Sequence, residues 1–140
     1  MKLIFTVLSV LLVGGLIAEA KTYKKCELVK ALYNHGIQKP KLADWVCLVQ
    51  WESSFSTTAT HRNNDGSTDY GIFQINNKYW CDSDYEANEC NVPCKSLLND
   101  DITKAIKCAK LIYNRQGFDA WYGWQDHCKG KPLPDISDCF

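Results

Sequence analysis

The chain has 140 residues, and its 16 Lys plus Arg balance its 16 Asp plus Glu to a formal net charge of zero. This balance argues against nucleic acid as a partner, because nucleic-acid binding needs a strongly basic surface. The length is that of one domain, and beyond the N-terminus no apolar stretch is long enough to anchor the chain in a membrane.

The N-terminus has the pattern of a secretory signal. Met1-Lys2 supplies a short positive start, residues 3–17 are apolar or small, and Ala18-Glu19-Ala20 fits the small-x-small cleavage pattern. We therefore expect a signal peptide over 1–20, one domain over 21–140 and a secreted, extracellular protein.

Eight cysteines accompany this signal. They are Cys26, Cys47, Cys81, Cys90, Cys94, Cys108, Cys128 and Cys139. In an oxidising compartment such a set is typical of four disulfides, although spacing alone does not choose among the many possible pairings. A zinc site is disfavoured, because Cys90 and Cys94 are the only close pair and the three histidines are scattered. We expect no metal and no cofactor.

Two helices are predicted in the first third of the domain. Residues 26–34 have apolar side chains four apart, and Gly36 is placed to end that helix. A second helix is expected after Pro40. Its core-facing stripe contains Leu42, Trp45, Val46 and Val49.

Glu52 continues that apolar stripe, three residues beyond Val49. A carboxyl group in this position is expected at the edge of apolar surface, where desolvation disfavours the charged form and raises the pKa. The alternative is a glutamate at a frayed helix end in water, since most carboxylates are exposed.

Asp69 follows a run of turn-forming residues, 62–67, in which Asp65-Gly66 is a hairpin signal. Strand-favouring residues come next, and strict alternation places Asp69 on the face of Gly71, Phe73 and Ile75. Hydrogen bonds from neighbours such as Asn76 or Ser67 would keep an acid on this mostly apolar face ionised. The alternative is an Asp that only organises the turn.

Two carboxyl groups in such unlike settings can hold different protonation states at one pH. Acid-assisted cleavage of a glycosidic bond requires such a pair. Glu52 and Asp69 are therefore the candidate catalytic residues.

The second half of the chain contains one clear helix. Residues 77–98 are predicted to be irregular and held by disulfides. A helix follows the acidic start at 99–101, has an apolar stripe from Ile102 to Tyr113, and ends at Gly117.

The aromatic residues are weaker evidence for a carbohydrate-binding site. Trp121 and Trp124, three residues apart, are more typical of a core than of a ligand platform. Trp80 lies beside Cys81 in the irregular segment, where an indole ring is not expected to bury fully.

The chain strongly resembles the C-type (chicken-type) lysozymes, and among them the insect members. The resemblance covers essentially all of residues 21–140. It is carried by Cys26-Glu27-Leu28, Trp51-Glu52-Ser53-Ser54, Asn64-Asp65-Gly66-Ser67, Asp69 to Asn76, Trp80-Cys81, Asp101-Ile102-Thr103 and Ala120-Trp121, together with eight cysteines in the family's order.

This resemblance implies an α+β, lysozyme-like fold. It consists of a helical lobe plus a small antiparallel β-sheet lobe, with an active-site cleft between them and four disulfides. The implied pairs are Cys26–Cys139, Cys47–Cys128, Cys81–Cys94 and Cys90–Cys108. Calcium binding, known in a related branch, is disfavoured because Asn99, Lys104 and Ala105 replace needed positions.

The resemblance also implies a function. Glu52 would be the general acid and Asp69 the nucleophile or stabilising carboxylate of a retaining muramidase. The substrate would be the β-1,4 link between N-acetylmuramic acid and N-acetylglucosamine in bacterial peptidoglycan, for antibacterial defence or digestion of bacteria. The sugar-binding residues would be Asn63, Gln74, Asn76, Tyr79, Trp80, the Ala120 backbone and Trp121, and a monomer is the default.

Two rival interpretations stay open on the residues alone. One is a catalytically silent carbohydrate-binding relative on the same scaffold, which loss of a catalytic acid would favour. The other is a disulfide-stapled interaction protein without a sugar site. The presence of both Glu52 and Asp69, with the flanking amides of the Asp69–Asn76 run, favours the enzyme.

Overall fold

The computed structural model describes residues 20–140, so the expected signal peptide lies outside the described residues except for Ala20. The helices are α2 (Lys25–Asn34), α3 (Lys39–Ser53), α4 (Thr103–Gln116) and α5 (Tyr122–His127). Short 3-10 turns cover η1 (Cys94–Leu98), η2 (Phe118–Ala120) and η3 (Ser137–Cys139). The strands are β1 (Thr60–Arg62), β2 (Thr68–Tyr70) and β3 (Ile75–Asn76).

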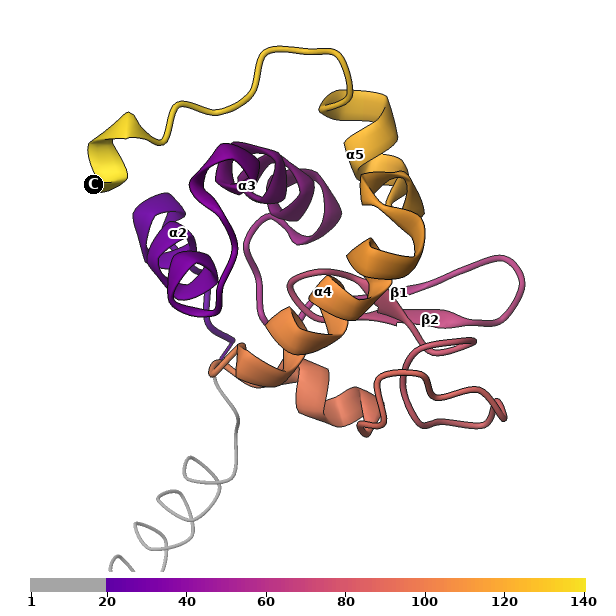
Figure 1. Ribbon diagram of the computed structural model, residues 1–140. Helices are drawn as coiled ribbons and strands as arrows, with labels where there is room; N and C mark the ends of the chain where they lie inside the picture. Colours follow the sequence, from indigo (N-terminus) through magenta and orange to yellow (C-terminus); the bar gives the residue numbers. More distant parts are fainter. Residues whose placement is uncertain (1–19) are drawn as a thin grey trace, which may run out of the picture.

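These elements form two lobes (Figure 1). Helices α2, α3 and α5 lie on one side, and the small sheet and the irregular segment after it lie on the other. From α5 an extended C-terminal segment runs back to α2, where η3 packs against that helix. The predicted α+β architecture is confirmed.

The predicted helices are present, with shifts of one or two residues at their starts. Helix α3 begins at Lys39 and has Pro40 in its first turn, where a missing N–H costs nothing. Helix α4 begins after Asp101, whose Oδ1 accepts hydrogen bonds from the backbone N–H and the hydroxyl of Thr103. It ends at Gly117, which adopts a φ of 69°.

The sheet corrects one prediction. Strand β2 ends at Tyr70, and residues 71–74 form a turn instead of continuing the strand to Ile75. The cause is local: Gly71 has a φ of 79° and Gln74 a φ of 49°, so the chain reverses. Strand β3 therefore returns antiparallel to β2, in the order β1-β2-β3.

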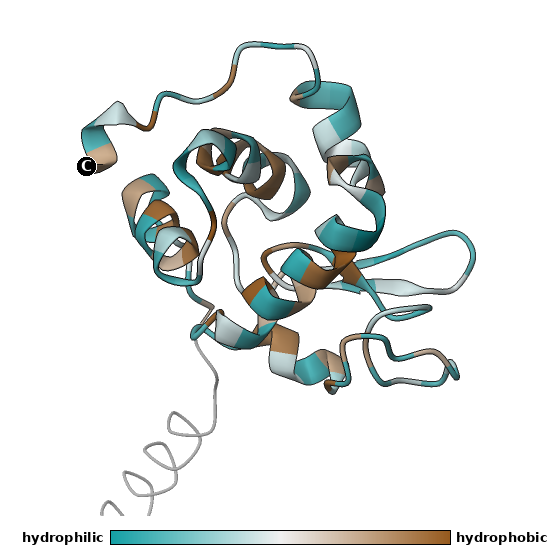
Figure 2. Ribbon diagram, viewed as in Figure 1, coloured by the Kyte–Doolittle hydropathy of each residue, from teal (hydrophilic) through white to brown (hydrophobic). Residues whose placement is uncertain are grey.

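Aromatic packing joins the two lobes around Trp45. This fully buried ring contacts Phe73 from the sheet side and Trp121 from the helical side, edge-on in both cases. Figure 2 shows hydrophobic and hydrophilic residues alternating along α3 and α4, as expected of helices that present one face to a core. The expectation that Trp80 stays partly exposed is wrong, because only 9% of it is accessible.

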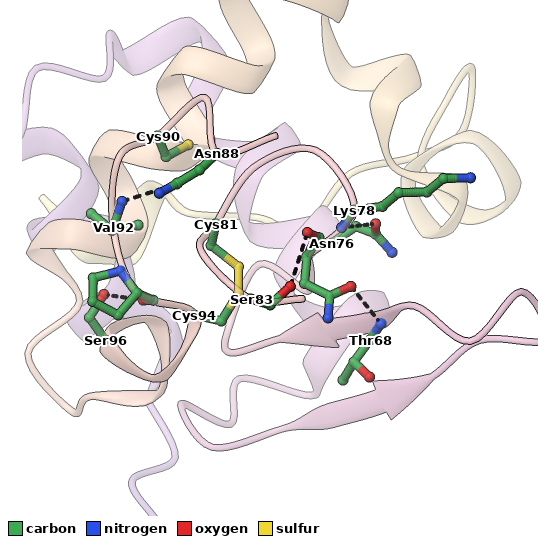
Figure 3. Close-up of a disulfide and its surroundings, with 12 residues drawn as sticks. Thr68, Asn76, Lys78, Cys81, Ser83, Asn88, Cys90, Val92, Cys94 and Ser96 are labelled. Carbon is green, nitrogen blue, oxygen red and sulfur yellow. Dashed lines mark hydrogen bonds between the residues drawn. A yellow bond between two sulfur atoms is a disulfide. The ribbon is translucent and has the colours of Figure 1, made fainter. Parts of the chain in front are cut away.

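The four disulfides are Cys26–Cys139, Cys47–Cys128, Cys81–Cys94 and Cys90–Cys108, the pairing that the resemblance implies. The third closes the irregular segment after β3 onto η1 (Figure 3). Within residues 20–140, no helix is both long and apolar enough to cross a membrane.

Candidate active site

A cleft of about 500 Å³ lies between the two lobes. Its wall on the helical side comes from α3, α4, η2 and α5, and its other wall comes from the sheet and the residues after β3. The lining residues are Glu52, Asn63, Asn64, Asp65, Ser67, Asp69, Gln74, Ile75, Asn76, Lys78, Tyr79, Trp80, Ile112, Gln116, Ala120, Trp121 and Tyr122. All nine predicted site residues are among them.

Glu52 lies in the last turn of α3 and is half-buried. Burial raises the pKa of its carboxyl group, and the nearby charges of Asp69 and Asp126 raise it further. The Gly123 N–H donates to Oε2 at 2.9 Å and lowers the pKa, as does His61, but burial is the largest effect. The raised pKa predicted from the apolar stripe is confirmed.

Gly123 permits this close approach of α5 to the acid. A Cβ atom at residue 123 would lie 2.8 Å from Oε2 of Glu52. The missing side chain therefore lets the backbone N–H reach the carboxyl group directly.

Asp69 lies in the middle of β2, paired with His61 on β1 and Asn76 on β3. The Nδ2 of Asn76 donates to its Oδ1 at 2.9 Å, as expected from the sequence. The expected bond from Ser67 is absent, because that hydroxyl donates to Asp65 at 2.6 Å. Asp69 therefore presents a hydrogen-bonded carboxylate to the cleft, in a more polar setting than that of Glu52.

Asn76 is held at both ends of its amide. Its Nδ2 also donates to Ser67 Oγ at 2.8 Å, and its Oδ1 accepts from the Lys78 N–H at 2.8 Å (Figure 3). The amide of Asn63 reaches the same Ser67 hydroxyl at 3.2 Å. This network fixes the orientation of the Asp69 carboxylate relative to the sheet.

The side chains of two other predicted residues, Gln74 and Trp121, form hydrogen bonds with backbone groups of the protein. Gln74 is buried, and its Nε2 donates to the backbone oxygens of Ala59 and Gly71, so it holds the turn between β2 and β3. Trp121 is 4% exposed and donates from Nε1 to the Phe73 oxygen at 2.8 Å. Trp121 therefore links the two walls of the cleft, whereas Gln74 fixes the wall on the sheet side.

Several lining residues were not predicted as site residues. Asn64, Asp65 and Ser67 lie in the turn-forming run close to Asn63, and Lys78 directly precedes Tyr79. Their closeness in sequence to predicted site residues could therefore have identified them as cleft residues. Tyr122 directly follows the predicted residue Trp121, so the same signal applied to it.

No metal centre is formed in the described part of the chain. Between residues 20 and 140 the one grouping of possible ligand atoms is Cys26, Asp138 and Cys139. Both cysteines are joined in a disulfide, which removes their thiolates as ligands.

The His61 side chain offers a test of the electrostatics. It is exposed, lies opposite Asp69 on the same face of the sheet, and its positive charge lowers the pKa of Glu52. We expect His61→Asn to raise the pKa of Glu52, because it removes the positive charge that lowers it. Carbon NMR titration of the Glu52 carboxyl measures this shift, which should shrink at high salt because the histidine is exposed.

His61→Lys is the matched control, since it keeps a cation at the same position. Its Glu52 titration should stay close to the wild-type curve. A Glu52 curve that does not move in His61→Asn at low salt would contradict the assignment of charge coupling to His61.

One desolvated carboxyl group and one hydrogen-bonded carboxylate, facing a cleft lined by amides and aromatic rings, define a glycoside hydrolase. The sequence model of the C-type lysozyme/alpha-lactalbumin family matches residues 21–139. The chain is 65% identical to lysozyme c-1 of Anopheles gambiae over the full length of both chains. It is 55% identical to a lysozyme of Bombyx mori, covering 99% of this chain and 98% of that one.

A solved structure agrees with the fold. The crystal structure of a lysozyme from Litopenaeus vannamei superposes with a TM-score of 0.74 at 43% identity, covering 79% of this chain and 90% of that one. The chain belongs to the C-type lysozyme/alpha-lactalbumin family. Within it the protein is a glycoside hydrolase, in line with the lysozyme relatives at high identity.

Proposed function

We propose that this enzyme is a muramidase that hydrolyses the β-1,4 bond between N-acetylmuramic acid and N-acetylglucosamine in bacterial peptidoglycan. The observation that carries the proposal is the contrast between its two acids. Glu52 is desolvated and has a raised pKa, whereas Asp69, in the same cleft, accepts a hydrogen bond from Asn76.

Each acid then has one role in a retaining mechanism, for which lysozymes are the reference case. Protonated Glu52 donates its proton to the glycosidic oxygen as the bond to C1 breaks. The Asp69 carboxylate attacks C1 or stabilises the positive charge that develops there. Glu52 then takes a proton from the incoming water, and the second half-reaction restores both acids.

The amide and aromatic side chains of the cleft would hold the glycan. Asn76 places an amide beside Asp69, and Asn63 joins the same network through Ser67. On the same wall Tyr79 supplies an exposed ring, and the mostly buried Trp80 lines the cleft. Gln74 and Trp121, with the Ala120 backbone, complete the proposed sugar-binding set. Because Gln74 and Trp121 already bond to backbone groups, their contribution is mainly to shape the cleft.

Asp69→Asn tests the role of the second acid. We expect clearing of a bacterial cell-wall suspension to fall at least about 100-fold, because the amide cannot form the covalent intermediate or neutralise the developing charge. Initial clearing rates across pH, with circular dichroism to check the fold, measure this effect. Asp84→Asn, on an exposed loop, is the matched control and should retain wild-type rates.

The outcome that favours a different function is equally concrete. If the wild-type protein bound glycan strands but cleared no cell walls at any pH, a carbohydrate-binding protein without catalysis would be supported. If Asp69→Asn kept wild-type rates, the assignment of Asp69 would be wrong.

The route to the substrate is part of the proposal. A signal peptide over 1–20 would direct a domain of residues 21–140 out of the cell, where its four disulfides would be stable. The enzyme would then act as an extracellular monomer, without nucleic acid as a partner, in antibacterial defence or in digestion of bacteria.

A further inference from the structure

Tyr122 is an exposed aromatic residue at the edge of the cleft. It is the first residue of α5, it lines the cleft, and 79% of it is accessible. Among residues 20–140 its ring forms no aromatic pair and its hydroxyl no hydrogen bond with the protein. By contrast, the exposed Tyr33 packs edge-on against Phe140. A free ring face in a binding cleft is available to a ligand.

The backbone on both sides of Tyr122 is anchored. The preceding Trp121 is buried and bonded to the Phe73 oxygen at 2.8 Å. The following Gly123 donates its N–H to Glu52 Oε2 at 2.9 Å. Tyr122 is therefore held at a fixed place directly beside the proposed catalytic acid, on a structured part of the chain.

A second exposed tyrosine lines the same cleft from the other wall. Tyr79 is 53% exposed and follows the β3 residue Asn76, which holds Asp69. Tyr79 thus lies on the wall that carries Asp69, and Tyr122 lies on the wall that carries Glu52. In retaining cleavage the nucleophile stays with the retained sugar, whereas the acid protonates the oxygen of the leaving sugar. The oxygen that Glu52 protonates belongs to the leaving saccharide, so an aromatic ring anchored next to Glu52 is placed near that saccharide.

We propose that Tyr122 is the stacking platform for the leaving-group saccharide, the pyranose ring of the β-1,4-linked N-acetylhexosamine that departs with the proton of Glu52. This assignment rests on the proposed muramidase function and adds a binding residue to it. The tyrosine ring packs against the C–H face of the sugar, as aromatic side chains pack on other apolar faces.

The Tyr122 ring can also bind an acceptor saccharide after the leaving saccharide has departed. When a second saccharide occupies it before water arrives, the hydroxyl oxygen of that saccharide attacks C1 of the glycosyl–Asp69 ester. The C1–Oδ bond breaks, Asp69 leaves as the carboxylate, and Glu52 takes the hydroxyl proton. The product is a longer glycan, so Tyr122 promotes glycosyl transfer relative to hydrolysis.

The test uses a peptide-free hexasaccharide of alternating N-acetylglucosamine and N-acetylmuramic acid, with its reducing end converted to the alditol. Mass spectrometry then separates alditol-ended transfer products longer than the hexasaccharide from the products of hydrolysis. In Tyr122→Ala we expect the ratio of transfer to hydrolysis to fall between about twofold and tenfold, as for loss of one aromatic contact, because an acceptor saccharide must occupy the platform.

Three variants complete the design. Tyr122→Phe keeps the ring and should reproduce the wild-type ratio. Tyr79→Ala removes the ring on the Asp69 side, and it should lower the overall rate of cleavage while leaving the ratio of transfer to hydrolysis unchanged. Tyr33→Ala removes another exposed tyrosine, one that does not line the cleft, and should leave the ratio of transfer to hydrolysis unchanged.

The outcomes separate the two proposals. A wild-type ratio of transfer to hydrolysis in Tyr122→Ala would overturn the platform assignment while leaving the muramidase intact. Absence of any cleavage of the hexasaccharide and of cell walls by the wild-type enzyme would overturn both.

Discussion

Glu52→Gln is expected to lower the rate of cell-wall clearing at least about 100-fold, the range that loss of a general acid produces. Glutamine has nearly the same shape as the glutamate, but it cannot transfer a proton to the glycosidic oxygen. Initial clearing rates across pH measure the effect. Glu86→Gln, on an exposed loop outside the cleft, is the matched control and should keep wild-type activity.

The stability of the same variant checks that the fold is intact and that Glu52 is desolvated. Because the pKa of Glu52 is raised above its ordinary 4.5, the native state binds more protons than the unfolded chain as pH rises from there to the folded pKa. Glu52 therefore makes the wild-type protein lose stability across that window, and glutamine does not. We expect the free energy of unfolding of Glu52→Gln, relative to wild type, to increase between pH 4 and pH 7 in urea titrations.

A variant that loses activity together with stability at every pH would instead indicate damage to the fold. A fully active Glu52→Gln would contradict the assignment of the general acid.

Gly71→Ala is expected to cost more than about 3 kcal/mol of unfolding free energy. Gly71 has a φ of 79°, and an added Cβ would overlap the backbone oxygen of Leu97 in η1. Backbone atoms cannot rotate away as a flexible side chain can, so either the turn after β2 or η1 has to move. Chemical denaturation at a fixed pH measures the loss, and activity should fall with it because this turn brings Asn76 back to Asp69.

Gly130→Ala separates the two causes of that loss. Gly130 has a φ of 67°, and a Cβ added there would meet nothing within 4 Å, so only the conformational cost of about 1–2 kcal/mol applies. Equal losses in the two variants would show that the approach of Leu97 does not matter. A loss in Gly71→Ala that clearly exceeds the control would locate the excess in that contact.

Glu52 illustrates what local pattern can predict. Its place on the apolar stripe of α3 depends only on the helical repeat, and a residue on the buried face meets apolar surface whatever the partner is. The raised pKa therefore followed from residues 42–52 alone. The sequence pattern could not predict that Gly123 would supply the hydrogen bond, because α5 lies far along the chain.

Asp69 illustrates the opposite case. Alternation predicted one long strand, whereas the positive φ angles at Gly71 and Gln74 break it and fold Asn76 back onto Asp69. The two residues are seven positions apart and would lie on opposite faces of a continuous strand. The polar setting of Asp69 is a product of the turn, and the expected partner Asn76 reaches it only through that turn.

Sequence by itself determined the secondary structure of the long helices, the cysteine set, the apolar face that desolvates Glu52 and, through the resemblance, the family. These properties depend on residues close together in the chain or on long identical runs. Tertiary structure alone decided the burial of Trp80, the charge effect of His61 on Glu52, and the hydrogen bond from Gly123 to Glu52. Each of these depends on which distant segments meet, and periodicity in one segment carries no information about its partner.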